Sequence, residues 1–392
     1  MSGRADRRTA ALPPLYGDLR RWGLVAADSL ALLTAFPDAS VDAVVTDPPY
    51  GLNFNQHAWD GGSLASGEGF QVFTAEWTSQ LRRILKPGAY LAAFGASRTA
   101  HRLIAGVEDG GLEVRDQLLW LYGTGVPKSR RLPGGLGSAL KPAYEPIVLA
   151  RRLLDPATPA TLANVARHGT GALNIDGARI ERPASDATRG GFWPPNVALS
   201  HQVGCGSAVC RPDCATTLID EIAARERRPD SPPLSRLFYA AKAARAEREA
   251  GCERLATRVS PIFSHGDGKP RARSNLHPTV KPISLMRWVV RLVVPPGGVV
   301  LDPFAGSGST GSPPCWSAAS LSVSSGTTST SRSLVRAYGT GQSWRMQSVG
   351  TRHDRRIGGS QVGLDGPAAG AKEHQLFCAR RQRHPIQGGV FA

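Results

Sequence analysis

Val44-Val45-Thr46-Asp47-Pro48-Pro49-Tyr50-Gly51 is the stretch that decides the fold class of this chain. The apolar run from Val41 to Val45 predicts a short buried strand. Because proline has no N–H for a sheet ladder, the two prolines predict that the chain leaves the sheet at Asp47. Open α/β sheets bind their ligands at the carboxyl ends of strands. The stretch therefore predicts an α/β sheet that carries a carboxylate and an aromatic ring at its ligand-binding edge.

The residue types in this turn suit the handling of a planar amine. Asp47 and the carbonyl of Pro48 can accept hydrogen bonds from an exocyclic amino group. The ring of Tyr50 offers a face for base stacking, a contact worth ~1–3 kcal/mol. The alternative is an ordinary strand-ending turn with a packed tyrosine. The candidate catalytic residues are Asp47, Pro48, Pro49 and Tyr50.

A second acid–proline turn lies near the end of the patterned sequence. The apolar run from Val299 to Leu301 predicts another buried strand, and Asp302-Pro303-Phe304-Ala305-Gly306-Ser307-Gly308-Ser309-Thr310 follows it. The glycines would let the backbone approach a ligand closely, and Ser309 or Thr310 could cap a following helix. Such a turn indicates a nucleotide-like cofactor, and no lysine follows the glycines as a P-loop would require.

Between these turns lies His277-Pro278-Thr279-Val280-Lys281-Pro282. Together the three motifs resemble the amino-methylating (N6-adenine/N4-cytosine) DNA methyltransferases, in the motif order of the β class, over roughly residues 28–311. The resemblance implies a Rossmann-like α/β methyltransferase fold that depends on S-adenosylmethionine, with a doubly wound, mostly parallel sheet and an inserted target-recognition region. It also implies methylation of DNA, with adenine N6 favoured over cytosine N4 because position 47 is Asp rather than Ser.

The resemblance implies roles for single residues. The target base would flip out of the duplex, stack on Tyr50 and present its amino group to Asp47. For two cofactor residues the sequence leaves a structural alternative: Asp28 could cap a helix, and Lys281 could cap or form an ion pair. The implied cofactor-binding residues are Asp28, Thr279, Lys281, Pro282, Asp302, Phe304, Gly306, Gly308 and Ser309.

Charge points to a polyanionic partner, here double-stranded DNA. The chain of 392 residues has a formal charge of +16 and a pI near 10.2. Residues 123–142 contain four cations and no acid, so this loop is either a solvated surface loop or a phosphate-contacting one. Its predicted DNA-binding residues are Lys128, Arg130, Arg131 and Lys141. A cognate restriction endonuclease is a further possible partner.

Cysteines and apolar runs bear on metal binding and localisation. Six cysteines without a secretion signal argue against a disulfide framework. His201, Cys205, Cys210 and Cys214 could close a structural zinc site, although no Cys-x2-Cys pair is present and reduced thiols are the alternative. No signal peptide and no run of about 18 apolar residues is evident, so we expect a cytoplasmic protein without a membrane span.

Periodicity predicts the helices and strands, and the family resemblance implies a division of the chain into five segments. Helices are expected at 30–36, 73–85, 97–107 and 282–294, and strands at 24–28, 89–94, 112–122 and 146–150. The segments are a disordered basic N-terminus (1–18), the catalytic half of the methyltransferase domain (19–150), the target-recognition insert (151–276), a truncated cofactor-binding half (277–311) and an unpatterned basic tail (312–392).

The tail departs from the resembled family. No Asp or Glu occurs from residue 303 to 353, and residues 312–392 hold ten Lys or Arg against three Asp or Glu. The family would have a helix and a strand ending in a ribose-binding acid here. A shifted reading frame, a degraded gene copy or a naturally disordered tail would each explain the change. Resequencing the gene tests the shifted frame, which fails if a one-base change restores no helix and no acidic strand end. The alternatives to DNA methylation are an inactive DNA-binding remnant, an RNA or protein-amide methyltransferase, and a nucleotide-binding module.

Overall fold

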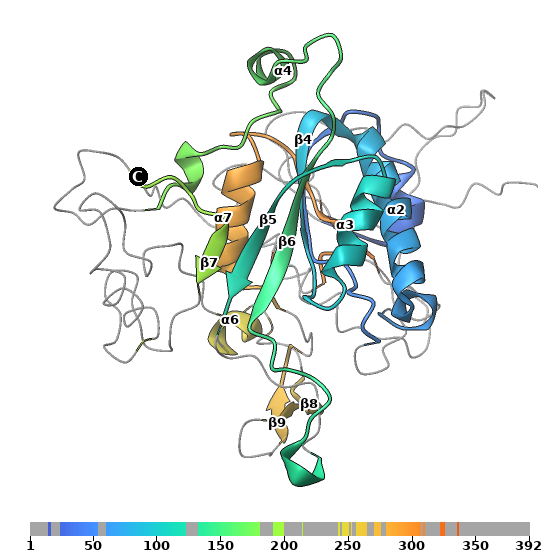
Figure 1. Cartoon of the computed structure of the whole chain (residues 1–392), viewed down its shortest axis with the longest axis vertical. Coiled ribbons are helices and arrows are strands. Elements are labelled where there is room, and N and C mark those ends of the chain that lie inside the picture. The colour runs from blue at the N-terminus through green and yellow to red at the C-terminus, as the bar shows by residue number, and fades with distance from the viewer. Residues whose placement is uncertain are drawn as a thin grey trace, which may run out of the picture.

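A six-stranded sheet forms the centre of the protein, whose structure is a computed structural model (Figure 1). The structure describes residues 15–16, 24–53, 60–122, 132–180, 191–199, 214, 242–243, 245–250, 252, 256–264, 270–275, 280–306, 309, 322–325 and 335–336. The strand order is β10 (Val300–Leu301), β3 (Val41–Thr46), β4 (Leu85–Phe94), β6 (Tyr144–Arg151), β5 (Glu113–Leu121) and β7 (Val197–Leu199).

Most of this sheet is parallel. β3 is parallel to both β10 and β4, and β5 is parallel to β7. β6 is antiparallel to its neighbours β4 and β5, so it alone runs against the other strands of this sheet. The prediction of a mostly parallel sheet is confirmed. The carboxyl ends of β3 and β5 and the start of β6 consequently meet at one edge.

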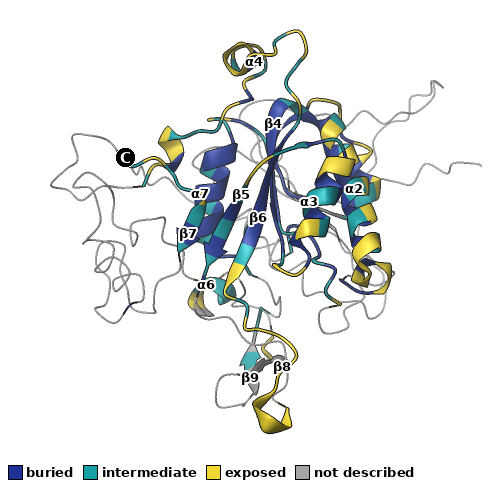
Figure 2. Ribbon diagram, viewed as in Figure 1, coloured by how far each residue is buried: buried dark blue, intermediate teal, exposed yellow. Residues whose placement is uncertain are grey.

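Helices cover both faces of the sheet (Figures 1 and 2). Side chains along β3 and β4 alternate between two cores, so Val44 and Leu91 face one while Ala43 and Ala92 face the other. The first core is closed by α1 (Ser29–Leu33), α2 (Gly67–Ile84) and α3 (Ala100–Asp109). The second is closed by α7 (Ile283–Val293). Coverage of both faces confirms the doubly wound architecture.

Residues in the predicted target-recognition insert contribute to the central sheet and to the packing on α7. β7 adds a strand to the sheet, and the turn η5 (Asp176–Ala178) packs on α7, where Trp288 Nε1 donates to the carbonyl of Ala178 at 3.1 Å. The remaining described elements there are α4 (Thr161–His168), α6 (Arg245–Glu249) and the antiparallel pair β8 (Arg258–Ser264) and β9 (Pro270–Arg273). The segment boundaries stay a prediction.

Short strands outside the central sheet involve both predicted terminal segments. β2 (Leu24–Ala27) lies between β1 (Leu15–Tyr16) and β11 (Ser322–Ser325), and β12 (Val335–Arg336) pairs with β11. The last two strands are the described part of the tail. Along the described part of the chain, no helix combines the length and the apolar character needed to cross a membrane.

Candidate active site

The chain leaves the sheet after β3 in a turn whose backbone is hydrogen-bonded to a buried carboxylate. Asp60 is 1% exposed and accepts the backbone N–H groups of Tyr50 at 2.8 Å, Gly51 at 2.7 Å and Leu52 at 3.2 Å. On the other side, Thr99 Oγ1 donates to the carbonyl of Tyr50 at 2.8 Å. The backbone that follows Asp47 is therefore fixed at several successive residues.

Gly51 is required at the end of this turn. Its φ is +64°, in the left-handed region that L side chains avoid. A Cβ atom there would lie 2.6 Å from the carbonyl oxygen of Leu64 and 2.8 Å from Phe70 Cγ. Only glycine therefore allows this turn to pack so closely against the start of α2.

The Asp47 carboxylate lies in a network of charged and phenolic groups. Its Oδ1 accepts the hydroxyl of Tyr50 at 2.6 Å, and its Oδ2 pairs with Lys281 Nζ at 2.5 Å. Glu145, near the start of β6, places Oε2 3.4 Å from the same Nζ and 3.3 Å from the Tyr50 hydroxyl. Glu145 Oε1 accepts the hydroxyl of Tyr122 at 3.2 Å. Asp47 and Glu145 thus both contact Lys281 and Tyr50, and Glu145 also accepts from Tyr122.

Burial and these neighbours shift the pKa values of Lys281 and Tyr50. Burial opposes the charge on Lys281, whose side chain is 5% exposed, but attraction to Asp47 and Glu145 outweighs it and raises the lysine pKa. Burial and the same two carboxylates raise the pKa of Tyr50 well above its usual range. Lys281 is therefore charged and Tyr50 neutral throughout the physiological range.

The raised pKa values predict a loss of stability in alkali. A group whose pKa is higher in the folded protein stabilises it fully below the unfolded pKa and less as pH rises through the folded pKa. For Lys281 and Tyr50 that loss begins above about pH 10. Urea unfolding of Tyr50→Phe should therefore show a flatter decline above pH 10 than the wild type. An identical decline in both proteins would contradict the network.

The second acid–proline turn lies directly beside the first. β10 and β3 pair in the register Val300↔Ala43 and Leu301↔Val44, so β10 ends beside Val44, two residues before the end of β3, and Asp302 follows next to the last residues of β3. Thr46 Oγ1 donates to Asp302 Oδ1 at 2.6 Å, and the backbone N–H of Phe304 donates to the same atom at 3.0 Å. The carboxylate of Asp302, which is 1% exposed, thereby ties the two turns together.

The other residues of this turn divide between core and surface. Phe304 is 5% exposed and packs its ring at 5.5 Å from Trp77 and 6.0 Å from Phe73, so its side chain belongs to the core. Gly306 has a φ of +50° and Ser309 is half-buried. A cofactor contact by Phe304 would therefore come from its backbone. Gly308 lies outside the described residues.

Three further cofactor predictions meet different surroundings. Asp28 caps α1 by accepting the N–H of Ala31 at 3.0 Å, which is the structural alternative foreseen for it. Pro282 is buried just before α7, and Lys281 forms the ion pair that was its structural alternative. Thr279 lies outside the described residues. Cofactor roles for these residues stay predictions.

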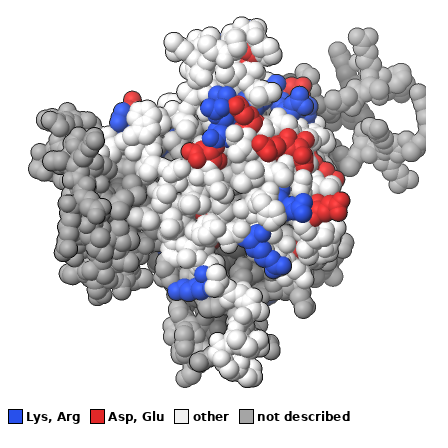
Figure 3. Space-filling model, in the orientation of Figure 1, with Lys and Arg blue, Asp and Glu red and all other residues white. Residues whose placement is uncertain are grey.

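The predicted DNA-binding loop begins and ends at the edge that carries Asp47. It leaves β5 after Leu121 and returns at Tyr144, next to Glu145, and its described residues 132–141, including Lys141, are exposed. Lys128, Arg130 and Arg131 lie outside the described residues. On the face shown in Figure 3, most acidic side chains lie away from the end at which this loop projects in Figure 1.

The zinc prediction has no support in the described part of the chain. Cys214 is buried, while His201, Cys205 and Cys210 lie outside the described residues. Among the residues that the structure describes, no group of three or more His, Cys, Asp or Glu side chains could hold a metal ion.

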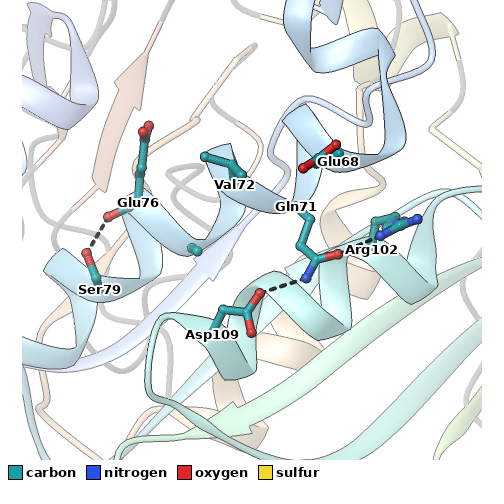
Figure 4. A pocket seen from close by; sticks show the side chains of 8 residues that line it. Glu68, Gln71, Val72, Glu76, Ser79, Arg102 and Asp109 are labelled. Carbon is teal, nitrogen blue, oxygen red and sulfur yellow. Dashed lines mark hydrogen bonds between the residues drawn. The ribbon is translucent and has the colours of Figure 1, made fainter.

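A surface hollow on the outer side of α2 and α3 is not part of the site (Figure 4). Three of its polar side chains contact one another: Gln71 Nε2 donates to Asp109 Oδ2 at 2.7 Å, and Arg102 donates to Gln71 Oε1 at 2.9 Å. The hollow carries more acidic than basic groups, which does not suit a polyanion. It is lined by Glu68, Gln71, Val72, Ala75, Glu76, Ser79, Arg102 and Asp109.

Two site residues were missed by sequence reasoning. Glu145 is an acid immediately before the apolar run of residues 146–150, and Asp60 lies in the polar sequence between the first acid–proline turn and α2. An isolated acid at the start of a buried strand is a signal that could have found Glu145. Asp60 carries no comparable signal, because its partners are backbone N–H groups.

The family model described as DNA methylase, for N6 and N4 methyltransferases, matches residues 41–312. The chain belongs to this DNA methylase family. The match includes both acid–proline turns, Lys281 and Glu145, and it ends one residue after Gly311, where the patterned sequence ends. The resemblance stated from the three motifs is confirmed.

Similar proteins include two DNA methyltransferases of Haemophilus. The type II methyltransferase M.HindIII of Haemophilus influenzae is 21% identical, with a match covering 38% of this chain and 63% of that protein. M.HpaI of Haemophilus parainfluenzae is 25% identical over 27% of this chain and 34% of its own. The matched part thus spans less than two thirds of either relative. A solved structure of the PvuII cytosine-N4-specific DNA methyltransferase is 15% identical, with a TM-score of 0.41 over 73% of this chain and 75% of that one.

Proposed function

We propose that this member of the DNA methylase family transfers a methyl group from S-adenosylmethionine to an exocyclic amino group in double-stranded DNA, with adenine N6 favoured over cytosine N4. The observation that carries the proposal is the pair of acid–proline turns joined by the 2.6 Å contact between Thr46 and Asp302. One turn presents the acceptor Asp47, and the other is of a glycine-rich kind that suits a nucleotide-like cofactor.

Asp47 and the carbonyl of Pro48 would accept hydrogen bonds from the amino group of a flipped base. These bonds hold the nitrogen lone pair out of conjugation with the ring and direct it away from the acceptors. Bound S-adenosylmethionine would supply an electrophilic methyl group, which joins nitrogen as its bond to sulfur breaks, the electron pair staying on sulfur and one nitrogen proton leaving to water. No covalent enzyme intermediate is needed, which agrees with the lack of a cysteine in the turn.

The turn after Asp302 has a backbone that a cofactor could approach closely. The buried Asp302 fixes the turn through Thr46 and Phe304, and Gly306 with its φ of +50° leaves the backbone without a Cβ toward a ligand. We propose that the turn residues Gly306, Gly308 and Ser309 contact the cofactor together with Thr279 and Pro282.

The proposal is tested by incubating the purified full chain with methyl-labelled S-adenosylmethionine and DNA from a host that lacks methyltransferases. We expect label in the DNA and none in RNA or added protein. A folded chain that leaves the DNA unlabelled overturns the proposal. Label in RNA or protein alone would assign a different substrate.

The basic loop gives a second, separate prediction. Changing Lys128, Arg130, Arg131 and Lys141 to Gln should weaken DNA binding and lower the slope of log Kd against log salt by about one per removed cation. Fluorescence anisotropy with a labelled duplex at several salt concentrations measures both quantities. A control variant with Arg82 of α2 changed to Gln should keep the wild-type slope, because α2 ends at Ile84, next to the start of β4 and away from the edge that carries Asp47. Equal slopes in all three proteins would contradict a role of the loop.

A further inference from the structure

Both oxygens of Asp47 are occupied in the structure. Oδ1 accepts the Tyr50 hydroxyl at 2.6 Å, and Oδ2 faces the Lys281 ammonium at 2.5 Å. A carboxylate oxygen that is neutralised by an ammonium at this distance is a poor acceptor for a neutral amine. An incoming amino group would therefore be bound more strongly once Lys281 has released Oδ2.

Lys281 cannot release Asp47 without another partner. Its side chain is 5% exposed, and its ammonium has the faces of Tyr50 and Phe94 at 5.5 and 5.1 Å. Removing one partner of a buried ion pair leaves an uncompensated charge, which is strongly unfavourable. A second anion within reach of Nζ would remove that penalty.

Glu145 provides that anion. Its Oε2 lies 3.4 Å from Lys281 Nζ, which is within ion-pair range but longer than a hydrogen bond. The carboxylate is fixed by the Tyr122 hydroxyl at 3.2 Å and by the pairing of β6 with β5, in which Glu145 faces Trp120. The flexible stem of lysine allows the ammonium to cover the remaining distance.

We propose that Glu145 is a positioning residue, the second acceptor to which the Lys281 ammonium moves when a substrate amino group takes Oδ2 of Asp47. The Tyr50 hydroxyl, 3.3 Å from the same Oε2, can follow and release Oδ1. The two carboxylates have different roles: Asp47 accepts the substrate amino group, and Glu145 binds the Lys281 ammonium that has left Asp47. The identity of the incoming group rests on the proposed function, whereas the transfer of the ammonium between acceptors does not.

The transfer is tested first without catalysis, by urea unfolding of four variants of the full chain. Asp47→Asn and Glu145→Gln each leave Lys281 one anion, so each alone should have a modest effect. The double variant leaves the buried ammonium without an anion. The fold-increase in its unfolding equilibrium constant should be at least ten times the product of the fold-increases in the two single variants. Adding Lys281→Met to the double variant should restore most of the loss. Effects that simply multiply, or no recovery when the lysine is replaced, overturn the proposal.

Methyl transfer supplies the second readout. Glu145→Gln should lower kcat about tenfold and leave the affinity for S-adenosylmethionine unchanged, with partial rescue by Glu145→Asp. In a Lys281→Met background the same Glu145→Gln change should alter kcat less than about twofold, because no ammonium remains to be moved. An undiminished effect in that background contradicts the proposal. If the wild type transfers no methyl group, the proposed function fails while the unfolding experiment still decides the role of Glu145.

Discussion

Asp47→Ala should abolish methyl transfer while leaving a folded protein. Loss of the carboxylate removes the acceptor that orients the amino group, and the expected decrease in kcat is about a thousandfold. The fold should survive because Lys281 keeps Glu145 as an anion at 3.4 Å. Initial rates with labelled S-adenosylmethionine and unmethylated DNA measure the effect.

The control for this variant is binding of the methyl donor. Asp47 is proposed to contact the base and not the cofactor, so calorimetric titration with S-adenosylmethionine should give a Kd within about threefold of the wild type, a change of less than about 1 kcal/mol. Asp42→Asn is a matched substitution of another acid on β3. Asp42 lies away from the turn, and its Oδ1 is 2.6 Å from Lys86 Nζ. This variant should retain transfer. An Asp47→Ala protein that methylates DNA at the wild-type rate would contradict the assignment.

Asp60→Ala should both destabilise the protein and disable it. Three backbone N–H groups of the turn after β3 lose their acceptor, and hydrogen bonds to a charged group contribute about 1.5–3 kcal/mol each. We expect the free energy of unfolding to fall by about 3 kcal/mol or more. Because the turn carries Tyr50, a displacement of about 1 Å should also reduce kcat by roughly a hundredfold.

Asp60→Asn is the matched control. Its amide oxygen can still accept from Tyr50 and Gly51, which share Oδ1 at 2.8 and 2.7 Å, whereas the contact with Leu52 is lost. Urea unfolding should rank the proteins wild type, Asp60→Asn and Asp60→Ala in order of decreasing stability. Equal stability of the Ala variant and the wild type would show that Asp60 does not hold the turn.

Much of the fold could be predicted from the sequence because its signals are local. The apolar run before Asp47 predicted β3, and the periodicity of residues 73–85 predicted the buried side of α2, including Trp77 at 0% exposure. Both acid–proline turns were predicted to follow buried strands, and the parallel pairing of β10 with β3 in the structure brings them together. The antiparallel direction of β6 depends on the long loop after β5, which carries no sign of where it returns.

The network around Asp47 could not be predicted in the same way. Lys281 lies 234 residues from Asp47 and Glu145 lies 95 residues from Tyr50, so their meeting depends on the complete sheet and α7. Sequence reasoning placed Lys281 at the cofactor, with an ion pair as its alternative, and the structure shows the ion pair. The sequence likewise placed Phe304 in a ligand-binding turn, but its side chain packs against Trp77 in the core.

The measurement that tests the central claim most directly is the identity of the modified base. Unmethylated DNA is incubated with the purified chain and S-adenosylmethionine, digested to nucleosides and analysed by mass spectrometry. We predict N6-methyladenine from the wild type and none from Asp47→Ala. Detection of N4-methylcytosine would support the proposed reaction with cytosine, not adenine, as the target base. The absence of any methylated nucleoside from a folded chain that binds S-adenosylmethionine would contradict the proposed function.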